Sequence, residues 1–473
     1  MAVSTEQSIL NMLKTWYKDK VVSLLFRNSP VLKMLNTMRV EGKEQAWPAI
    51  SSRGGAVAGD ATVAVQTAAT NFRAEAFRIE EGQLFSYFSY NNKEVLASKS
   101  RKGAYMKLAG VKAFAAAEAF RKTLASALYG RGFGEVGVVP AAASGTALSS
   151  AGVDIELTDD TIIRIDINSK LVLKSSVANS TILAHLVVTK KDGNVVTVTS
   201  SDTYTLTGTE IIALDGSMVG TKPLLPMGLA GWLPYVNARK DGVSDTNWSS
   251  YINTPFYNVT RSINTDGLAG QFVKGISGEK KYKTIIKLIK KLRDAGSEAD
   301  LIILNPDDWL EVSEEIASSN TYFTQTSTRS KREANVGFDK LSASFSTNFI
   351  DLVVDDPYCP KSVFYVLDKS TVEIWTYTHA DAVIQDTIAG NNPGKQDPED
   401  FNDGGREDDP YKLLIDDYIS IAPNGVSTDG ESTRVAFNGY MNIVVTNPSV
   451  NGVGLFYTEV SGSEDYSHVL GYL

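Results

Sequence analysis

The segment from residue 46 to residue 80 has few large apolar side chains, and this limits how it can fold. It begins WPAISSRGGAVAGDATVAVQ, where small residues and glycines dominate, and continues as NFRAEAFRIE. In the second stretch the side chains alternate between two faces, with Phe72, Ala74 and Ala76 on one and Arg73 and Glu75 on the other. The pattern predicts a long two-stranded hairpin with a glycine-bearing tip. Because a hairpin with so little apolar surface is not stable alone, we expect it to be stabilised from outside its own fold.

A long amphipathic helix is predicted next, over residues 104–129. Its apolar stripe follows helical spacing and consists of Met106, Ala109, Ala113, Ala117, Phe120, Leu124 and Leu128. A second face gathers the charged side chains Lys107, Glu118, Arg121 and Lys122. At 1.5 Å per residue the helix is about 40 Å long, and its alanines let a neighbouring element approach closely. We expect this helix to be a structural spine that carries no catalytic residues.

The run GRGFGEVG at residues 130–137 has the glycine spacing of a dinucleotide-binding loop, with Gly132, Gly134 and Gly137. That fingerprint works only where it follows a strand and opens a helix, whose N-terminus then faces a pyrophosphate. Here the glycines follow a helix and lead into VVP and a small-residue linker. We therefore expect them to turn the chain, with Gly130 as a left-handed C-cap of the helix, and we expect no cofactor.

Residues 141–225 are predicted to form an all-β domain, a sandwich or a barrel, inserted into a surface loop. Ile163, Ile165 and Ile167 alternate with polar residues, which predicts a strand. LAHLVVTKKDGNVVTVTS predicts two strands joined by a turn at KKDGN, and SDTYTLTGTEIIAL predicts one or two more. Small, flexible or proline-bearing stretches flank the segment, as expected of an insertion.

From about residue 226 the pattern changes to mixed α and β. GEKKYKTIIKLIKKLRDAG predicts a helix that ends at Gly296, with an inward face of Tyr282, Ile285, Ile286, Ile289 and Leu292. Its polar side carries Lys280, Lys281, Lys283, Lys287, Lys290, Lys291 and Arg293, enough to attract phosphate. Aromatic residues for base stacking are absent from that side. A solvated or inter-subunit face is favoured, and a DNA contact is the alternative.

A strand followed directly by a helix is predicted within ADLIILNPDDWLEVSEEI. The strand covers Leu301–Leu304, and Asn305 is the expected N-cap, with Pro306 at the first helical position. Asp307 and Asp308 suit the positive end of the helix. Further strands are predicted between residues 350 and 377 and again near the C-terminus in AFNGYMNIVVTNPSV.

The N-terminal segment predicts a short amphipathic helix, with Ile9, Met12, Leu13 and Trp16 at helical spacing. It either docks on its own domain or reaches a neighbouring subunit. No secretory signal is recognised in this segment, and no stretch approaches the roughly 20 apolar residues of a membrane span. The single cysteine, Cys359, fits a reducing compartment. We expect a soluble protein made in the cytoplasm.

Composition and motifs give no support to an active site. A net charge of −9 argues against a dedicated polyanion binder. The three histidines, His185, His379 and His468, form no zinc motif, and neither a P-loop nor a nucleophile elbow occurs. An acidic run without the register of a calcium loop contains Asp397, Glu399, Asp400, Asp403, Glu407, Asp408 and Asp409. We expect no enzyme, no metal site and no catalytic residue.

The order of these parts resembles the major capsid protein of tailed bacteriophages, the Hong Kong 97-type fold. FSYNNKEVLASKSRKGAYMKLAGVKAFAAAEAFRKTLASALYGRG and LIILNPDDWLEVSEEI carry the resemblance, which covers residues 1–140 and 226–473. The inserted β-domain is not part of the minimal fold and resembles the insertion domains of some capsids. Large crAss-like phages are one candidate source.

The resemblance implies an α+β fold with a particular division of the chain. The implied parts are an N-terminal arm (1–45), an extended hairpin loop (46–85), a peripheral domain with the spine helix (86–140), the inserted β-domain (141–225), an axial α/β domain with an acidic loop at 381–430 (226–430), and C-terminal strands (431–473). It also implies self-assembly into hexamers and pentamers around double-stranded DNA in a virion that forms in the bacterial cytoplasm. Portal, scaffold and decoration proteins are the implied partners, with weak contacts to the packaged DNA and no membrane.

Three other readings stay open from the sequence. An encapsulin-like nanocompartment would use the same fold. A carbohydrate-binding surface protein would use the β-domain as an adhesive module, but Tyr204 is the only aromatic residue in it for a sugar platform. A cytoplasmic enzyme would need converging acids, bases or nucleophiles, and the sequence offers no such group.

Overall fold

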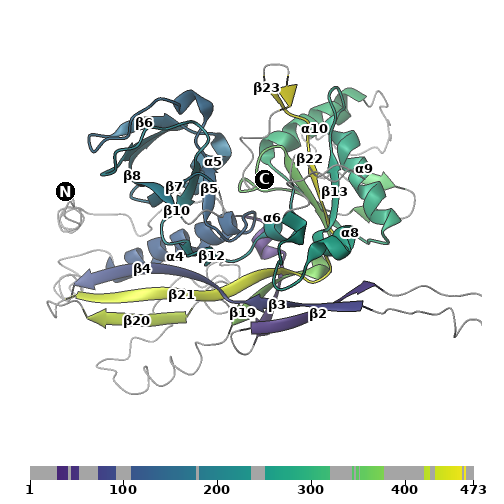
Figure 1. Cartoon of the computed structure of the whole chain (residues 1–473), viewed down its shortest axis with the longest axis horizontal. Helices are drawn as coiled ribbons and strands as arrows, with labels where there is room; N and C mark the ends of the chain where they lie inside the picture. The colour runs from purple at the N-terminus through teal and green to yellow at the C-terminus, as the bar shows by residue number, and fades with distance from the viewer. Residues whose placement is uncertain are drawn as a thin grey trace, which may run out of the picture.

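The computed structural model describes residues 29–40, 44–52, 73–91, 108–176, 181–235, 251–319, 343–345, 348–350, 352–377, 420–426, 432–460 and 463–464. Within these ranges the chain builds three sheets of five or six strands and four two-stranded ones. Figure 1 shows two lobes above a long, nearly flat layer of strands, with one helix between that layer and the first lobe. The fold is a mixed α and β fold.

The flat layer is a five-stranded sheet that gathers segments from the whole chain. Its path is β1 (Asn36–Val40), β19 (Val372–Tyr377), β21 (Ser432–Val445) and β20 (Ser420–Val426), and β4 (Gly82–Asn91) also pairs with β21. β1 is parallel to β19, and the other pairs are antiparallel. Residues 36–40 were expected in a terminal arm but form an edge strand here, where Val40 is buried. The predicted N-terminal helix lies outside the described residues.

The spine helix is α4 (Leu108–Ala127), which lies along β4. The Ser86 hydroxyl of β4 donates to the Ala116 carbonyl at 2.9 Å, and the ring of Phe120 closes on Gly439 of β21. The predicted helix is confirmed, although it ends at Ala127 rather than at residue 129. Residues 104–107 of the prediction lie outside the described residues.

Two of the charged side chains on the second face of α4 are buried in the structure. Arg121 and Lys122 are only 3% and 7% exposed. The Lys122 ammonium forms an ion pair with Asp166 and also donates to the Ile165 carbonyl at 3.5 Å. Asp166 and Ile165 belong to the lobe above α4, so the helix packs on two sides (Figure 1). The ammonium group of Lys122 is thus buried by a segment that is distant in the sequence.

That lobe is a six-stranded sheet with its own apolar core. In spatial order its strands are β5 (Glu135–Val138), β10 (Ile211–Leu214), β7 (Lys170–Lys174), β8 (Ile182–Asp192), β9 (Val195–Thr199) and β6 (Val153–Glu156). The predicted hairpin around the DGN turn is confirmed as β8 and β9. The described chain from residue 135 to 214 therefore forms one compact unit, whose core is separate from that of the rest of the fold.

The expected strand through Ile163, Ile165 and Ile167 is wrong. Residues Asp159–Arg164 form the helix α5, so the segment is not all-β. Ile162 and Ile165, three residues apart, are buried as on one helical face, whereas Ile167 is 52% exposed. Asp159 and Asp160 at the positive N-terminal end favour a helix. The burial of Ile162 together with Ile165 follows helical spacing and not the alternating spacing of a strand.

The second lobe is a five-stranded sheet with two helices packed on it. Its strands, in order, are β13 (Gln271–Lys274), β22 (Gly452–Leu455), β18 (Val363–Leu367), β14 (Leu301–Leu304) and β17 (Leu352–Asp355). The helices are α9 (Lys281–Asp294) and α10 (Pro306–Ser319). The predicted strand at 301–304 and both helices are confirmed, and Gly296 ends α9 with a φ of 81°.

Short elements connect the three sheets. They are β11 (Met218–Val219) with β12 (Lys222–Pro223), α6 (Leu229–Trp232), α8 (Thr265–Ala269), β15 (Ala343–Phe345) with β16 (Asn348–Ile350), β23 (Glu459–Val460) with β24 (Ser463–Glu464), and single 3-10 turns at Val31–Lys33, Ala141–Ala143, Arg261–Ile263, Lys369–Thr371 and Pro448–Val450. The remaining pair is β2 (Glu44–Ser52) with β3 (Arg73–Glu80), a separate two-stranded ribbon.

Candidate subunit interface

The glycine run after α4 has a conformational role in the backbone. Gly132 and Gly134 have φ values of 80° and 71°, so they turn the chain as predicted. Gly130 has no left-handed φ among the described residues, which corrects the expected C-cap. Its N–H instead closes a turn by donating to the Ala127 carbonyl at 3.0 Å. The strand β5 begins at Glu135, within the run, so no helix N-terminus is available there for a pyrophosphate.

Gly137 has a different role, because it lets α5 approach β5. A Cβ atom at this position would lie 2.2 Å from the Thr161 side chain. We expect Gly137→Ala to lower the free energy of unfolding by about 1–3 kcal/mol, as overpacking does in a closed core, measured by denaturant unfolding. The double variant Gly137→Ala with Thr161→Ala should recover a large part of the loss. Equal losses in both variants would contradict the steric explanation.

The other residues singled out in the sequence do not converge. His185 is exposed on β8, and its backbone N–H donates to Asp202 at 2.7 Å. Cys359, the single cysteine of the sequence, is buried and forms no disulfide. His379, His468 and the acidic run at 397–409 lie outside the described residues. Within the described ranges no group of three or more His, Cys, Asp or Glu side chains could hold a metal. None of the helices there is long and apolar enough to cross a bilayer.

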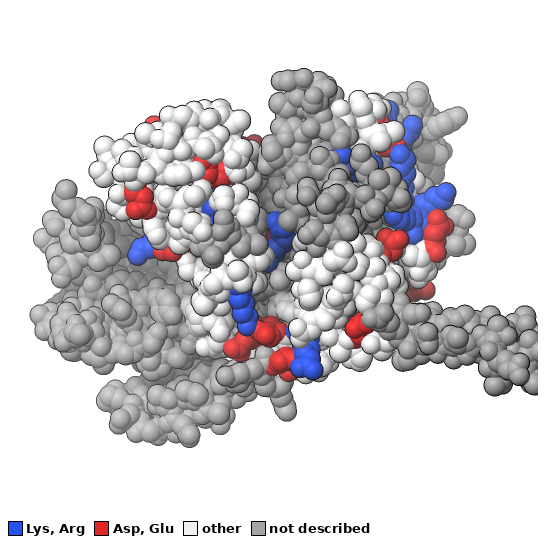
Figure 2. All heavy atoms as spheres, viewed as in Figure 1, with Lys and Arg blue, Asp and Glu red and all other residues white. Residues whose placement is uncertain are grey.

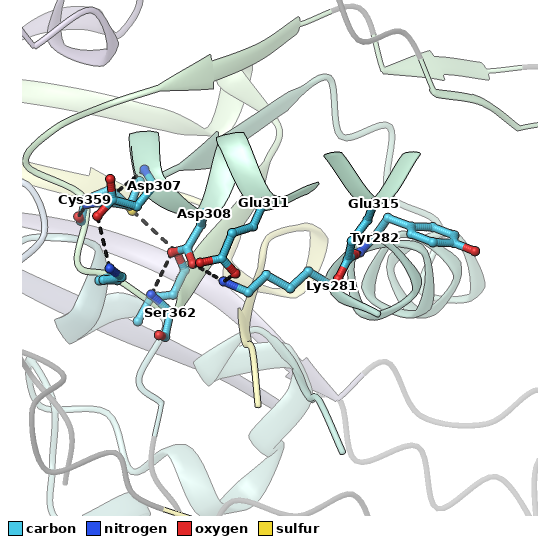
Figure 3. A network of polar contacts seen from close by, with 11 residues as sticks. Lys281, Tyr282, Asp307, Asp308, Glu311, Glu315, Cys359 and Ser362 are labelled. Carbon is cyan, nitrogen blue, oxygen red and sulfur yellow. Dashed lines mark hydrogen bonds and ion pairs between the residues drawn. The ribbon is translucent and has the colours of Figure 1, made fainter. Parts of the chain in front are cut away.

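A dense polar network joins the N-terminal ends of α9 and α10 (Figure 3). Lys281 extends from α9 to Asp308 and Glu311 of α10, with N–O distances of 2.6 Å to each. Asp308 also accepts the Ser362 N–H at 2.7 Å, and Asn305 caps α10 by accepting the Asp307 N–H at 3.0 Å. The predicted N-cap is confirmed.

The charges of this network are satisfied within the subunit. Burial lowers the pKa of Lys281, but the carboxylates of Asp308 and Glu311 more than offset it, so the pKa is raised. Asp307 pairs with Lys361 at 3.0 Å. The Asn305 amide donates to the Cys359 carbonyl at 2.7 Å. Because these charged and polar side chains are paired with one another, the network is suited to fixing two helices and a loop in place and not to proton transfer.

The ribbon β2–β3 is anchored to the core along one face. Phe77 is buried, with its ring centroid 5.4 Å from that of Trp232. Trp47 donates its indole N–H to the Thr446 carbonyl at 3.0 Å and stands edge-on to Trp375. The Tyr377 hydroxyl donates to the Ile79 carbonyl at 3.0 Å. Figure 1 shows the ribbon leaving the flat sheet on the side opposite to β20.

The other face of the ribbon is open in the single chain. Small apolar residues line it, namely Ala46 and Pro48 on β2 and Ala74 and Ala76 on β3, and all four are exposed. The predicted alternation of Ala74 and Ala76 against Glu75 is confirmed, and the structure adds that the buried side is the one that carries Phe77 and Ile79. Residues 53–72, the expected tip, lie outside the described residues. An anchored ribbon thus presents a strip of small apolar side chains to its surroundings, and the exposed Glu44–Arg78 ion pair lies on the same face beside it.

Sequence reasoning missed the residues that hold this ribbon in place. Asn442 on β21 is only 2% exposed and uses both ends of its amide. Its oxygen accepts the Met227 N–H at 2.7 Å, and its nitrogen donates to the Glu80 carbonyl at 2.9 Å and to the Tyr257 hydroxyl at 2.8 Å. No local pattern marks such a residue, because its partners come from three distant segments.

This combination of a flat sheet under a spine helix, a projecting ribbon and an α/β lobe is similar to the fold of a solved phage capsid chain. No protein-family model matches the chain, and no curated protein matches it. Among solved structures, the "Cyanophage A-1(L) capsid asymmetric unit" aligns with a TM-score of 0.51 at 12% identity, over 96% of this chain and 98% of that chain. At this identity the similarity is one of fold.

Two further structures align over nearly their whole length with lower scores. A chain of Mycobacterium phage Adephagia aligns with a TM-score of 0.41 at 10% identity, over 97% of this chain and 100% of that chain. The holo-SrpI encapsulin complex from Synechococcus elongatus gives a TM-score of 0.41 at 8% identity, with 97% and 100% covered.

Proposed function

We propose that this chain is the major capsid protein of a tailed bacteriophage. Copies of it would assemble into hexamers and pentamers and close an icosahedral shell around double-stranded DNA. The fold shared with the cyanophage capsid chain supports a role in a shell. The open apolar strip of the ribbon is the observation that carries the proposal, because it is rigidly held and yet uncovered in the single chain.

The parts of the chain would divide this task. The arm (1–45) and the hairpin loop (46–85) would contact neighbouring subunits, the peripheral segment (86–140) would stiffen the shell, and the axial segment (226–430) would meet its copies at the capsomer centre. The inserted segment (141–225) would decorate the surface, and strands 431–473 would tie the two main parts together. The virion would form in the bacterial cytoplasm, with portal, scaffold and decoration proteins as further partners.

The energetics favour contacts in trans. Burying apolar surface gives about 25 cal/mol per Å², so the exposed side chains of Ala46, Pro48, Ala74 and Ala76 would stabilise a flat contact with a neighbour, next to the Glu44–Arg78 ion pair on the same face. Each subunit would make several such modest interfaces, and a closed shell multiplies them. Alanine and proline also let the neighbouring backbone approach closely.

The proposal is tested by measuring whether variants of the protein still assemble into closed shells. We expect Ala76→Asp to abolish closed particles, because the substitution adds a charge to a surface that has to be buried in the interface, while the subunit stays folded. Electron microscopy and sedimentation of the expressed protein measure assembly, and circular dichroism measures folding. The control is Ala142→Asp, an exposed alanine on the six-stranded lobe, which should assemble normally.

A second variant on the same strip tests whether the effect of Ala76→Asp is specific to that one position. Ala74→Asp, two residues along the same strand and exposed on the same face, should block assembly in the same way. Closed particles from both strip variants, equal in yield to the wild type, would contradict the proposal. Shells that form without ever enclosing DNA in an infected host would favour the encapsulin-like alternative, and a wild-type protein that stays monomeric at high concentration would point to a surface-binding protein.

A further inference from the structure

One side of α9 carries a row of regularly spaced, exposed lysines. The opposite side packs into the lobe through Thr284, Ile285, Leu288, Ile289 and Leu292. Lys283, Lys287 and Lys290 are exposed and follow one another at spacings of four and three residues, and Lys280 precedes them. Between Lys283 and Lys290 the helix rises about 10 Å. Lys280, Lys283, Lys287 and Lys290 are called the lysine stripe below, and Figure 2 shows blue side chains gathered over α9.

The stripe is only partly neutralised by the subunit's own acids. Lys287 pairs with Glu279 at 2.5 Å. Lys283 and Lys290 form no ion pair with another described residue. Asp294, which is exposed on the same side of the helix, lies at the C-terminal end and limits the basic surface to the turns before it. The outcome is a local positive surface on a chain whose net charge is −9.

We propose that the lysine stripe is a contact surface for the phosphate backbone of double-stranded nucleic acid. A duplex carries one negative charge per about 1.7 Å of its axis. A helix of this length lying against it spans several phosphates, which flexible lysine side chains can reach without one fixed register. Lysine is a compact point charge on a flexible stem and needs no fixed fork geometry for this. The contact reads no sequence and depends on salt.

The surroundings of the stripe favour a duplex over a protein or a single strand. The centre of a protein interface is depleted in charge and enriched in aromatic side chains, whereas the exposed residues of the stripe are all lysines. A single strand needs aromatic rings on which bases stack. The nearby Tyr282 ring is half-buried and already faces the Lys280 ammonium, whose Nζ lies 5.8 Å from the ring centroid.

The inference deepens the proposed function and rests on it only for the identity of the duplex as packaged DNA. If it holds, α9 lies on the genome side of the shell. Binding of a duplex by the full-length chain is measurable whether or not shells form, so a failure of assembly and a failure of this contact are distinguishable.

The experiment measures binding of a fluorescent 30-base-pair duplex to the full-length protein by anisotropy as salt is varied. For three phosphates neutralised, the logarithm of the affinity should fall against the logarithm of salt with a slope of about −2.7, a loss of about 40-fold between 50 and 200 mM. Lys283→Glu with Lys290→Glu should weaken binding at least about tenfold at 50 mM salt and reduce the slope by about two.

The matched control is Lys170→Glu with Lys190→Glu, which makes the same change of net charge on the exposed surface of the six-stranded lobe. It should bind as the wild type does. Equal losses in the two double variants would mean that only overall charge matters and would overturn the proposal. Displacement of the duplex by poly-glutamate at an equal concentration of charges would also overturn it, because the surface would then be one for acidic protein.

Discussion

Phe77→Ala is expected to lower the free energy of unfolding by about 3–5 kcal/mol, the cost of removing a fully buried aromatic ring. Phe77 is 1% exposed and packs edge-on against Trp232 and Phe256, with centroid distances of 5.4 and 6.4 Å. It is the main apolar anchor of β3, so its loss also loosens the ribbon. Chemical denaturation measures the first effect, and hydrogen exchange of the β2 and β3 amides measures the second.

Phe85→Ala makes the same chemical change at a site with less burial. Phe85 is 38% exposed and contacts Tyr440 edge-on at 5.7 Å. A loss of about 1 kcal/mol is expected there, since an aromatic pair contributes about that much beyond its burial. If the two variants lost equal stability, or if ribbon exchange did not speed up in Phe77→Ala, the anchoring role of Phe77 would be refuted.

Lys281→Met is expected to cost about 3–5 kcal/mol, because it leaves the buried Asp308 carboxylate without its cation. The Asp308 side chain is fully buried, and that of Lys281 is 15% exposed. Lys287→Met breaks an ion pair whose lysine is 49% exposed and should cost at most about 1 kcal/mol. Thermal and denaturant unfolding of the two variants give the comparison.

Two further measurements isolate the buried charge. Adding Asp308→Asn to Lys281→Met should recover part of the loss, since an amide can still accept the Ser362 N–H without a charge to bury. The pKa of Lys281 is raised above 10.5, so the pair's contribution is complete below that pH and is lost as pH rises through the raised value. The gap between wild type and Lys281→Met should therefore shrink above about pH 10.5. A gap that widened there would show that the pair does not hold the helices.

The fold was predictable where side-chain spacing within one segment is decisive. The α9 helix with its Gly296 terminus, the Leu301–Leu304 strand and the Asn305 cap were all predicted from local patterns, because helix capping and periodic burial depend on neighbours within a few residues. The candidate interface was predictable only in outline. The poverty of the ribbon in large apolar residues indicated a need for outside support, but its anchors at Trp47 and Asn442 left no sign in the sequence.

The sequence by itself determined which segments are periodic, where α10 begins and α9 ends, and that one hairpin is poor in large apolar side chains. Only the tertiary structure decided that Lys122 is buried, that residues 159–164 are helical, and that the apolar strip of β3 is the side left open. These outcomes depend on contacts across hundreds of residues, such as Lys122 with Asp166 or Trp47 with Thr446. Burial is set by whatever segment packs against a face, and a local pattern carries no information about that segment.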